Sequence, residues 1–185
     1  MSLKALTIIS DGVEEIEAIA PVDILTRAGV EVVVAGLTPG LIKAAYGNRL
    51  VAQVSVDDAD GLYDAIILPG GTINAENLAS SAKVVELVRR HYEAGRIVAA
   101  ICASPSHALA KAGILKGKRA TGAPVFAEKL AASGAILTDE RVTVDGNIVT
   151  AMGPGAALQF GLMLVEMLVD KATADKMANH WRLDR

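Results

Sequence analysis

Aromatic side chains and cysteines are scarce in this sequence. Aromatic residues make up 3% of its 185 residues, although 52% are hydrophobic, so the core has to be built from Val, Ile, Leu and Ala. Such a composition is typical of parallel strands covered by helices. The single cysteine excludes an internal disulfide and is typical of a protein of the reducing cytoplasm.

The sequence also lacks an excess of one charge and any long hydrophobic run. Its formal net charge is −3, and no basic stripe or basic amphipathic segment indicates nucleic acid or a membrane surface. No apolar run approaches the length of a membrane span, and the N-terminal residues indicate a strand rather than a signal peptide. We therefore expect one soluble cytoplasmic domain over residues 1–185, with neither nucleic acid nor a membrane as a partner.

Strand and helix patterns alternate along the chain. Apolar runs predict strands over 5–10, 31–37, 50–56, 65–68, 97–101, 119–121, 142–144 and 148–151. Helical patterns predict helices over 16–28, 81–94, 106–112, 124–132, 155–169 and 172–181. A loop or short hairpin is expected over 38–49 and a hairpin turn over 145–147. This alternation predicts an α/β fold, with a mostly parallel sheet and helices on both faces.

Three breaks in the pattern fall where predicted strands end. They are the segment 11–17, the turn Pro69-Gly70-Gly71 and the residue Cys102. In open α/β sheets, ligands bind beyond the carboxyl ends of the strands. We therefore expect these three segments to form one site.

The single cysteine follows the predicted strand 97–101. Small residues and a proline come next, and then a segment compatible with a helix. This pattern is typical of a nucleophile elbow, in which a tight turn holds a side chain over the positive end of a helix. Because backbone N–H groups there stabilise an anion, we expect the thiol of Cys102 to be unusually acidic and reactive. A small buried core cysteine is the competing interpretation.

Two glycines follow the predicted strand 65–68. Without a Cβ, Gly70 and Gly71 allow their backbone N–H groups to approach a ligand closely, so we expect them to line the substrate site. The amides of Gly71 and Ala103 are candidates for an oxyanion hole around an adduct on Cys102. An ordinary turn is the competing interpretation. The segment is neither a Walker loop nor a dinucleotide-binding fingerprint, because the lysine and glycine spacings of those motifs are absent.

Three glutamates follow the first strand, at positions 14, 15 and 17. A favourable interaction with the dipole of the following helix explains two of them. Glu17 has apolar neighbours and should turn inward, where desolvation raises the pKa of a carboxylic acid and keeps it protonated near neutrality. Glu17 is then able to donate a hydrogen bond to the thiolate of Cys102 or to move a proton during turnover.

The three histidines fit a thiol–imidazole mechanism poorly. His91 lies in a polar part of a predicted helix, and His180 lies near the C-terminus. His107 is expected to point away from Cys102. No cluster of His, Cys, Asp and Glu has the spacing of metal ligands, so we predict no metal and no cofactor.

In their order and spacing, the motifs resemble the ThiJ/PfpI superfamily, in particular the branch of the parkinsonism-associated deglycase and the bacterial YajL-type proteins. The resemblance covers nearly the full length, through motifs over 11–17, 21–23, 27–29, 63–64, 68–71, 99–105, 121–122 and 153–155. It implies a flavodoxin-like sandwich, related to class I glutamine amidotransferases and commonly a homodimer. It also implies that Cys102 is the nucleophile, Glu17 its partner, and Gly71 and Ala103 the oxyanion-hole amides.

The resemblance further implies activity on dicarbonyls of the methylglyoxal type. This is either a cofactor-free glyoxalase III reaction that gives lactate or the removal of early glycation adducts from proteins. It also implies reversible oxidation of Cys102, so a redox sensor or chaperone-like stress protein is a second reading. A hydratase of a small nitrogen compound is a third. The fold alone does not decide among these functions.

The sequence departs from its relatives at three positions. Ala103 stands where the protease and amidase branch has a histidine, which argues against peptidase activity. Gly122 stands where some relatives have a histidine, and Tyr46 stands where many have an arginine. Arg27, by contrast, matches an arginine that lies near the dimer interface of the family.

Overall fold

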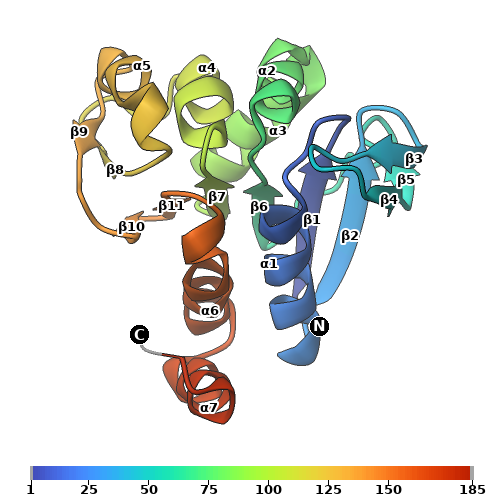
Figure 1. Cartoon of the computed structure of the whole chain (residues 1–185), viewed down its shortest axis with the longest axis vertical. Coiled ribbons are helices and arrows are strands. Elements are labelled where there is room, and N and C mark those ends of the chain that lie inside the picture. The colour runs from blue at the N-terminus through green and yellow to red at the C-terminus, as the bar shows by residue number, and fades with distance from the viewer. Residues whose placement is uncertain (1, 184–185) are drawn as a thin grey trace.

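A seven-stranded sheet runs through the centre of the computed structural model, which describes residues 2–183 (Figure 1). Its strand order is β10-β11-β7-β6-β1-β2-β5. The strands are β1 (Lys4–Ile9), β2 (Glu31–Gly36), β5 (Val54–Ser55), β6 (Ala65–Leu68), β7 (Ile97–Ile101), β10 (Val142–Asp145) and β11 (Ile148–Ala151). All neighbours in this sheet are parallel except β10 and β11, which form an antiparallel hairpin.

Helices cover both faces of the sheet, which confirms the predicted flavodoxin-like architecture (Figure 1). One face carries α1 (Glu15–Arg27), the short turn η3 (Pro154–Ala156), α6 (Ala157–Leu168) and α7 (Lys171–Trp181). The other face carries α2 (Thr72–Ser80), α3 (Ala82–Glu93), η1 (Pro105–Leu109), α4 (Ala110–Ala112), η2 (Pro124–Phe126) and α5 (Ala127–Ala132). Among the described residues, none of these helices has the length and apolar character that crossing a membrane requires.

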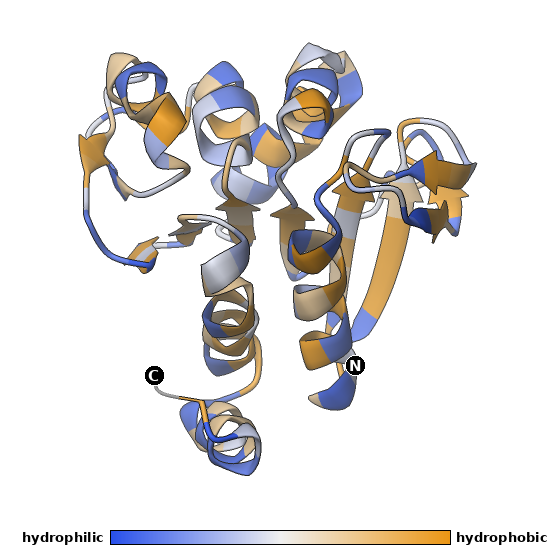
Figure 2. Cartoon of the chain, viewed as in Figure 1, coloured by the Kyte–Doolittle hydropathy of each residue, from blue (hydrophilic) through white to orange (hydrophobic). Residues whose placement is uncertain are grey.

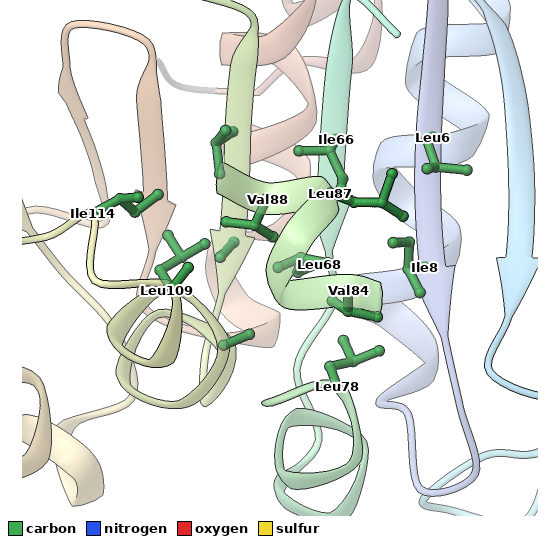
Figure 3. Close-up of a cluster of buried hydrophobic side chains, with 14 of the residues drawn as sticks. Leu6, Ile8, Ile66, Leu68, Leu78, Val84, Leu87, Val88, Leu109 and Ile114 are labelled. Atoms are coloured by element: carbon green, nitrogen blue, oxygen red, sulfur yellow. The ribbon is translucent and has the colours of Figure 1, made fainter. Parts of the chain in front are cut away.

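The alternation of side chains along the strands supplies both halves of the core. Ile66 and Leu68 of β6 join the cluster under α3, where Leu87 and Val88 pack against them (Figure 3). Ile67 of the same strand faces the opposite layer, beside α1 and α6. Because both faces are covered, the central strands are continuous apolar runs, as their hydropathy shows (Figure 2).

Most predicted elements begin and end within one residue of their predicted bounds. The expected strand 50–56 is an exception, because it divides into β4 (Arg49–Ala52) and β5. Gln53 lies between the two parts, where its N–H donates to the carbonyl of Val34 at 2.8 Å and its side chain accepts from the N–H of Val34 at 2.9 Å. This double contact turns the chain, so β4 pairs with β3 (Gly40–Lys43) in the expected hairpin while β5 joins the main sheet.

Two further elements carry no clear sequence pattern. Helix α2 buries only Asn74, Ala75 and Leu78, so too few apolar residues recur to reveal a helix. Strand β9 (Ile136–Leu137) has exposed side chains and pairs only with β8 (Arg119–Ala120), in a separate small sheet. Tertiary packing therefore defines both elements.

Candidate active site

The predicted elbow lies at the carboxyl end of β7. Cys102 has φ of +63°, a left-handed conformation that non-glycine residues rarely adopt. Its N–H donates to the carbonyl of Ala151 at 2.9 Å, and its carbonyl accepts from the N–H of Ala123 at 2.8 Å. Neighbouring segments thus hold both sides of the turn, and the half-buried thiol is presented above the sheet.

The first turn of α1 brings Glu17 to this elbow. Glu17 is fully buried, and its Oε2 accepts a 2.8 Å hydrogen bond from the N–H of Gly70. Its Oε1 is also buried and has no nitrogen or oxygen partner among residues 2–183. A Cβ placed on Gly153 would lie 3.8 Å from this oxygen and 4.0 Å from the sulfur of Cys102, so both atoms face the same small space.

The other two glutamates stabilise backbone near the site. Glu14 caps α1, because its Oε2 accepts from the N–H of Glu17 at 2.8 Å. Glu15 accepts from the N–H of Tyr46 at 2.9 Å and from the side chain of Asn48 at 3.1 Å. Glu17 is therefore the glutamate that contacts the thiol.

Gly70 and Gly71 place backbone between these segments. A Cβ on Gly70 would lie 2.3 Å from Oε2 of Glu17 and 2.6 Å from Cβ of Cys102, distances that real Cβ atoms do not tolerate. Gly71 has φ of +85°, and a Cβ there would lie 2.1 Å from the carbonyl oxygen of Gly12. The N–H groups of Gly71 and Ala103, the expected amides, lie near enough to the sulfur of Cys102 to lower the pKa of its thiol.

The structure contradicts the expected acidity of this thiol. Burial raises the pKa of Cys102 to about 12, and the charge of Glu17 and its hydrogen bond with the thiol act in the same direction. The amides of Gly71 and Ala103 lower that pKa but do not offset these effects. The expectation rested on backbone dipoles alone, whereas desolvation and the nearby carboxylate arise from tertiary packing.

Burial also raises the pKa of Glu17, to about 7, and the charge of Glu14 adds to the rise. Hydrogen bonds from Cys102 and from the N–H of Gly70 oppose it. Because the charge of Glu17 disfavours the thiolate of Cys102 while the thiol stabilises the carboxylate, the pair titrates as a unit and holds one proton over the pH range between these two values.

Comparison with known proteins identifies the family of this chain. The sequence profile described as the DJ-1/PfpI family matches residues 3–167. The chain belongs to the DJ-1/PfpI family. Protein dj-1beta of Drosophila melanogaster is 36% identical over 180 residues, which cover 96% of each protein. The Parkinson disease protein 7 homolog of Danio rerio is 37% identical over 175 residues, which cover 92% of each protein.

Two Arabidopsis thaliana members of the family are longer. Protein DJ-1 homolog A is 40% identical over 92% of this chain, and homolog B is 45% identical over 88%. The matched segment is only 44% and 37% of the length of these relatives. Among solved structures, Toxoplasma gondii DJ-1, in an oxidized form, superposes with a TM-score of 0.94 at 34% identity, with full coverage of both chains.

Two of the three histidines of this DJ-1/PfpI member, His91 and His107, have structural partners. His91 is buried, accepts from the N–H of Tyr63 at 3.0 Å through Nε2 and contacts the carbonyl of Leu87 at 2.7 Å through Nδ1. Nδ1 of His107 lies 2.8 Å from the carbonyl oxygen of Ala103. Within residues 2–183, no group of three or more His, Cys, Asp or Glu is arranged to hold a metal ion.

Two of the three departures, Gly122 and Tyr46, and the matching Arg27 lie in different surroundings. Gly122 is adjacent to the elbow, because a Cβ there would lie 3.0 Å from the carbonyl oxygen of Cys102. Tyr46 is 80% exposed on the turn that Glu15 holds. Arg27 pairs with Asp23 at 2.7 Å and lies over the ring of Trp181.

Asn74 and Ser104 are buried residues near the site that the sequence pattern does not reveal. Both side chains donate hydrogen bonds to the carbonyl of Pro69, at 2.9 Å and 2.5 Å. Asn74 lies in the unpredicted helix α2, and Ser104 resembles any small residue after an elbow. In the sequence, Asn74 is only an amide at the third residue of a helix, and its role becomes clear once its hydrogen-bond partners are known.

Proposed function

We propose that this protein is a cysteine-dependent, cofactor-free glyoxalase that converts methylglyoxal-type dicarbonyls to 2-hydroxy acids. The observation that supports the proposal is the meeting of a buried acid and a thiol: Oε1 of Glu17 faces Cys102 without any other partner among the described residues. Early methylglyoxal adducts of proteins are a second substrate class, because the sulfur of Cys102 would displace the protein amine from the aminocarbinol carbon to give the same hemithioacetal. Either substrate has to reach a sulfur that is half-buried.

The proposed reaction begins with transfer of the thiol proton from Cys102 to Glu17. The sulfur then forms a bond to the aldehyde carbon of the substrate, and the aldehyde oxygen becomes an alkoxide. The N–H groups of Gly71 and Ala103, which already lie near the sulfur, stabilise this charge. Glu17 returns the proton to the alkoxide, which gives a neutral hemithioacetal and regenerates the carboxylate.

Glu17 next moves a proton between the two carbonyl carbons. Its carboxylate removes the hydrogen of the former aldehyde carbon, and the electron pair forms a carbon–carbon double bond as the ketone oxygen becomes an enolate. The same proton is added to the second carbon, while the hydroxyl proton passes to the second oxygen. The product is a thioester of the 2-hydroxy acid, and water hydrolyses it to the free acid and the thiol of Cys102.

A raised thiol pKa is compatible with this role. With one proton shared in the pair, the state with a neutral Glu17 and a thiolate on Cys102 is a tautomer of the state with a carboxylate and a thiol. Its population stays constant with pH while the pair holds one proton. The acid partner, rather than a globally acidic thiol, therefore supplies the nucleophile near neutrality.

Turnover of methylglyoxal tests the proposal directly. Lactate formation is measured for the natural protein, for Cys102→Ser and for Ser133→Ala, which removes a hydroxyl that donates to the carbonyl of Leu130 at the end of α5. We expect lactate from the natural protein and from Ser133→Ala, and none above background from Cys102→Ser. Equal rates for the natural protein and Cys102→Ser, or no lactate from either, would refute the proposal.

A second candidate function is redox sensing at the same thiol. It is favoured by the similarity to the oxidized Toxoplasma gondii protein and by the half-buried sulfur beside an unpartnered carboxyl oxygen. Hydrogen peroxide would transfer one oxygen to the thiolate of Cys102 and leave hydroxide, which gives a sulfenic acid, and a second equivalent would give the sulfinic acid. Peroxide-dependent mass gain at Cys102 without any lactate formation would favour this function over catalysis.

We also propose that the protein is a homodimer through the face of α1. Large apolar side chains on α1 and the neighbouring β3–β4 hairpin are about half exposed or more: Ile16, Ile19, Leu41 and Val51. A groove of about 360 Å³ lies between these elements. We expect a dimer in sedimentation experiments and a monomer after Ile19→Glu, and a natural protein that sediments as a monomer would refute the proposed dimer.

We also propose a cytoplasmic location, with which the single thiol is consistent.

A further inference from the structure

One peptide unit joins the elbow to the acid. The N–H of the Pro69–Gly70 peptide donates to Oε2 of Glu17 at 2.8 Å. Its carbonyl, on the opposite edge of the same plane, accepts from Nδ2 of Asn74 at 2.9 Å and from Oγ of Ser104 at 2.5 Å. Because a peptide is planar and its N–H and C=O point in opposite directions, whatever holds the carbonyl also aims the N–H.

We propose that Asn74 and Ser104 are positioning residues, which hold the Pro69–Gly70 peptide so that its N–H points at Glu17. The inference rests on the proposed function of the Cys102–Glu17 pair. Neither side chain contacts the thiol or the acid itself. Each side chain acts on Glu17 only through the Pro69–Gly70 peptide.

Asn74 is held rigidly from behind. Its side chain is fully buried, and its Oδ1 accepts from the N–H of Ser10 at 2.7 Å and from the hydroxyl of Ser10 at 2.9 Å. Its Nδ2 donates to the carbonyls of Pro69 and Gly70, the latter at 3.1 Å. Only a carboxamide accepts on one side and donates twice on the other, so an aspartate or a leucine of similar size does not reproduce these contacts.

Ser104 adds a link to the nucleophile. It lies two residues after Cys102 and is fully buried, so its hydroxyl moves with the elbow. A continuous path runs from the Ser104 hydroxyl, through the carbonyl and N–H of the Pro69–Gly70 peptide, to the carboxyl of Glu17. The turn that presents the thiol of Cys102 therefore also helps to position the N–H of Gly70, which donates to Glu17.

Loss of either side chain should change how Glu17 titrates. A buried carbonyl without its donors favours rotation of the peptide toward other partners, since an unsatisfied buried polar group is costly. Rotation withdraws the N–H of Gly70 from Glu17, and that hydrogen bond is one of the interactions that hold the pKa of Glu17 down. Glu17 should then stay protonated to a higher pH than in the natural protein.

Alkylation of Cys102 by iodoacetamide, measured against pH, reports this change without any substrate. Below the pKa of Glu17, the thiolate population rises with pH. Above it, the population levels off, because the pair then holds a constant single proton. In the natural protein we expect the rate to level off near pH 7, the value of Glu17. In Asn74→Ala and in the milder Ser104→Ala, levelling should occur at higher pH, and in Glu17→Gln it should be absent around neutrality.

A matched control exists at the other end of the sheet. Nδ2 of Asn147 also donates to two backbone carbonyls, those of Tyr92 at 3.1 Å and Arg96 at 2.8 Å. Asn147→Ala should lose stability, although less than Asn74→Ala because Asn147 is only part-buried, and should keep the natural alkylation profile. We also expect kcat for methylglyoxal to fall about tenfold to a hundredfold in Asn74→Ala, with a smaller change in KM, since misplaced catalytic groups cost rate.

Two results would overturn the inference. One is that the rate of Cys102 alkylation levels off at the same pH in Asn74→Ala and in Ser104→Ala as in the natural protein. The other is a shift in Asn147→Ala as large as theirs, which would indicate a general effect of destabilisation. If the natural protein makes no lactate, the proposed glyoxalase function fails, but the alkylation profiles still decide whether the two side chains position the pair. Should Asn74→Ala not fold, the profile of Ser104→Ala alone decides.

Discussion

The backbone N–H of Gly70 donates a 2.8 Å hydrogen bond to Oε2 of Glu17, across 53 residues of sequence. This contact brings the loop after β6 against the first turn of α1, and Cys102 lies against the same side of the glycine, since a Cβ on Gly70 would meet both residues. The acid and the nucleophile therefore meet at a glycine because no side chain stands between them. The predictions below follow from this arrangement and from the packing around it.

Gly70→Ala should inactivate the site. The new Cβ would meet Oε2 of Glu17 at 2.3 Å and Cβ of Cys102 at 2.6 Å, so the acid or the elbow has to move. We expect a loss in kcat of about a hundredfold or more and a loss of about 1–3 kcal/mol in the free energy of unfolding. Gly61→Ala is the control, because its Cβ would make only ordinary contact with the ring of Tyr63 at 3.5 Å. Retention of full activity in Gly70→Ala would contradict the geometry.

Glu17→Gln should uncouple the thiol from its acid. The amide keeps an oxygen to accept from Gly70 but carries no titratable proton, and it removes the charge that raises the pKa of Cys102. Lactate formation should fall by about 10²- to 10⁴-fold, the usual worth of general acid–base catalysis. Alkylation of Cys102 should keep rising with pH beyond 7. A kcat close to that of the natural protein would exclude Glu17 as the group that moves the proton.

His91 should make the protein less stable in mild acid. Burial lowers the pKa of His91, and its Nε2 accepts from the N–H of Tyr63, so the folded state disfavours the protonated ring. A lowered pKa means that the stabilising contribution is complete above the unfolded value of about 6.5 and is lost as the pH falls below it.

Urea unfolding of the natural protein and of His91→Gln at pH 7.5 and 5.5 measures this contribution, because the other titrating groups are common to both proteins. The difference in unfolding free energy between the two should be larger at pH 7.5 than at pH 5.5. A difference that does not change with pH would show that His91 is not the group responsible.

Gly161→Ala should loosen the packing of α1 on α6. A Cβ on Gly161 would lie 2.6 Å from Cδ1 of Ile24, the atom that Ile24→Val removes. The single substitution at Gly161 should cost about 1–3 kcal/mol of unfolding free energy, and adding Ile24→Val should recover part of that loss. Strictly additive losses in the double variant would mean that the two residues do not compete for this space.

Local sequence patterns were enough to predict the alternation of strands and helices, the position of the elbow and the choice of Glu17 among three glutamates. These features are local: an apolar run, a turn of small residues and a helix start are each written in a few consecutive residues. The order of motifs was also enough to indicate the DJ-1/PfpI family, which the match over residues 3–167 confirms.

The ionisation of the site and the residues that support it depend instead on how distant segments pack together. The pKa of Cys102 rises to about 12 because burial and Glu17 outweigh the amides of Gly71 and Ala103, and both Glu17 and Gly71 come from other segments of the chain. Asn74 likewise acquires its four hydrogen bonds only when β1, the loop after β6 and α2 meet. Desolvation and long-range hydrogen bonds depend on which distant residues share one volume, and a local sequence pattern does not contain that information.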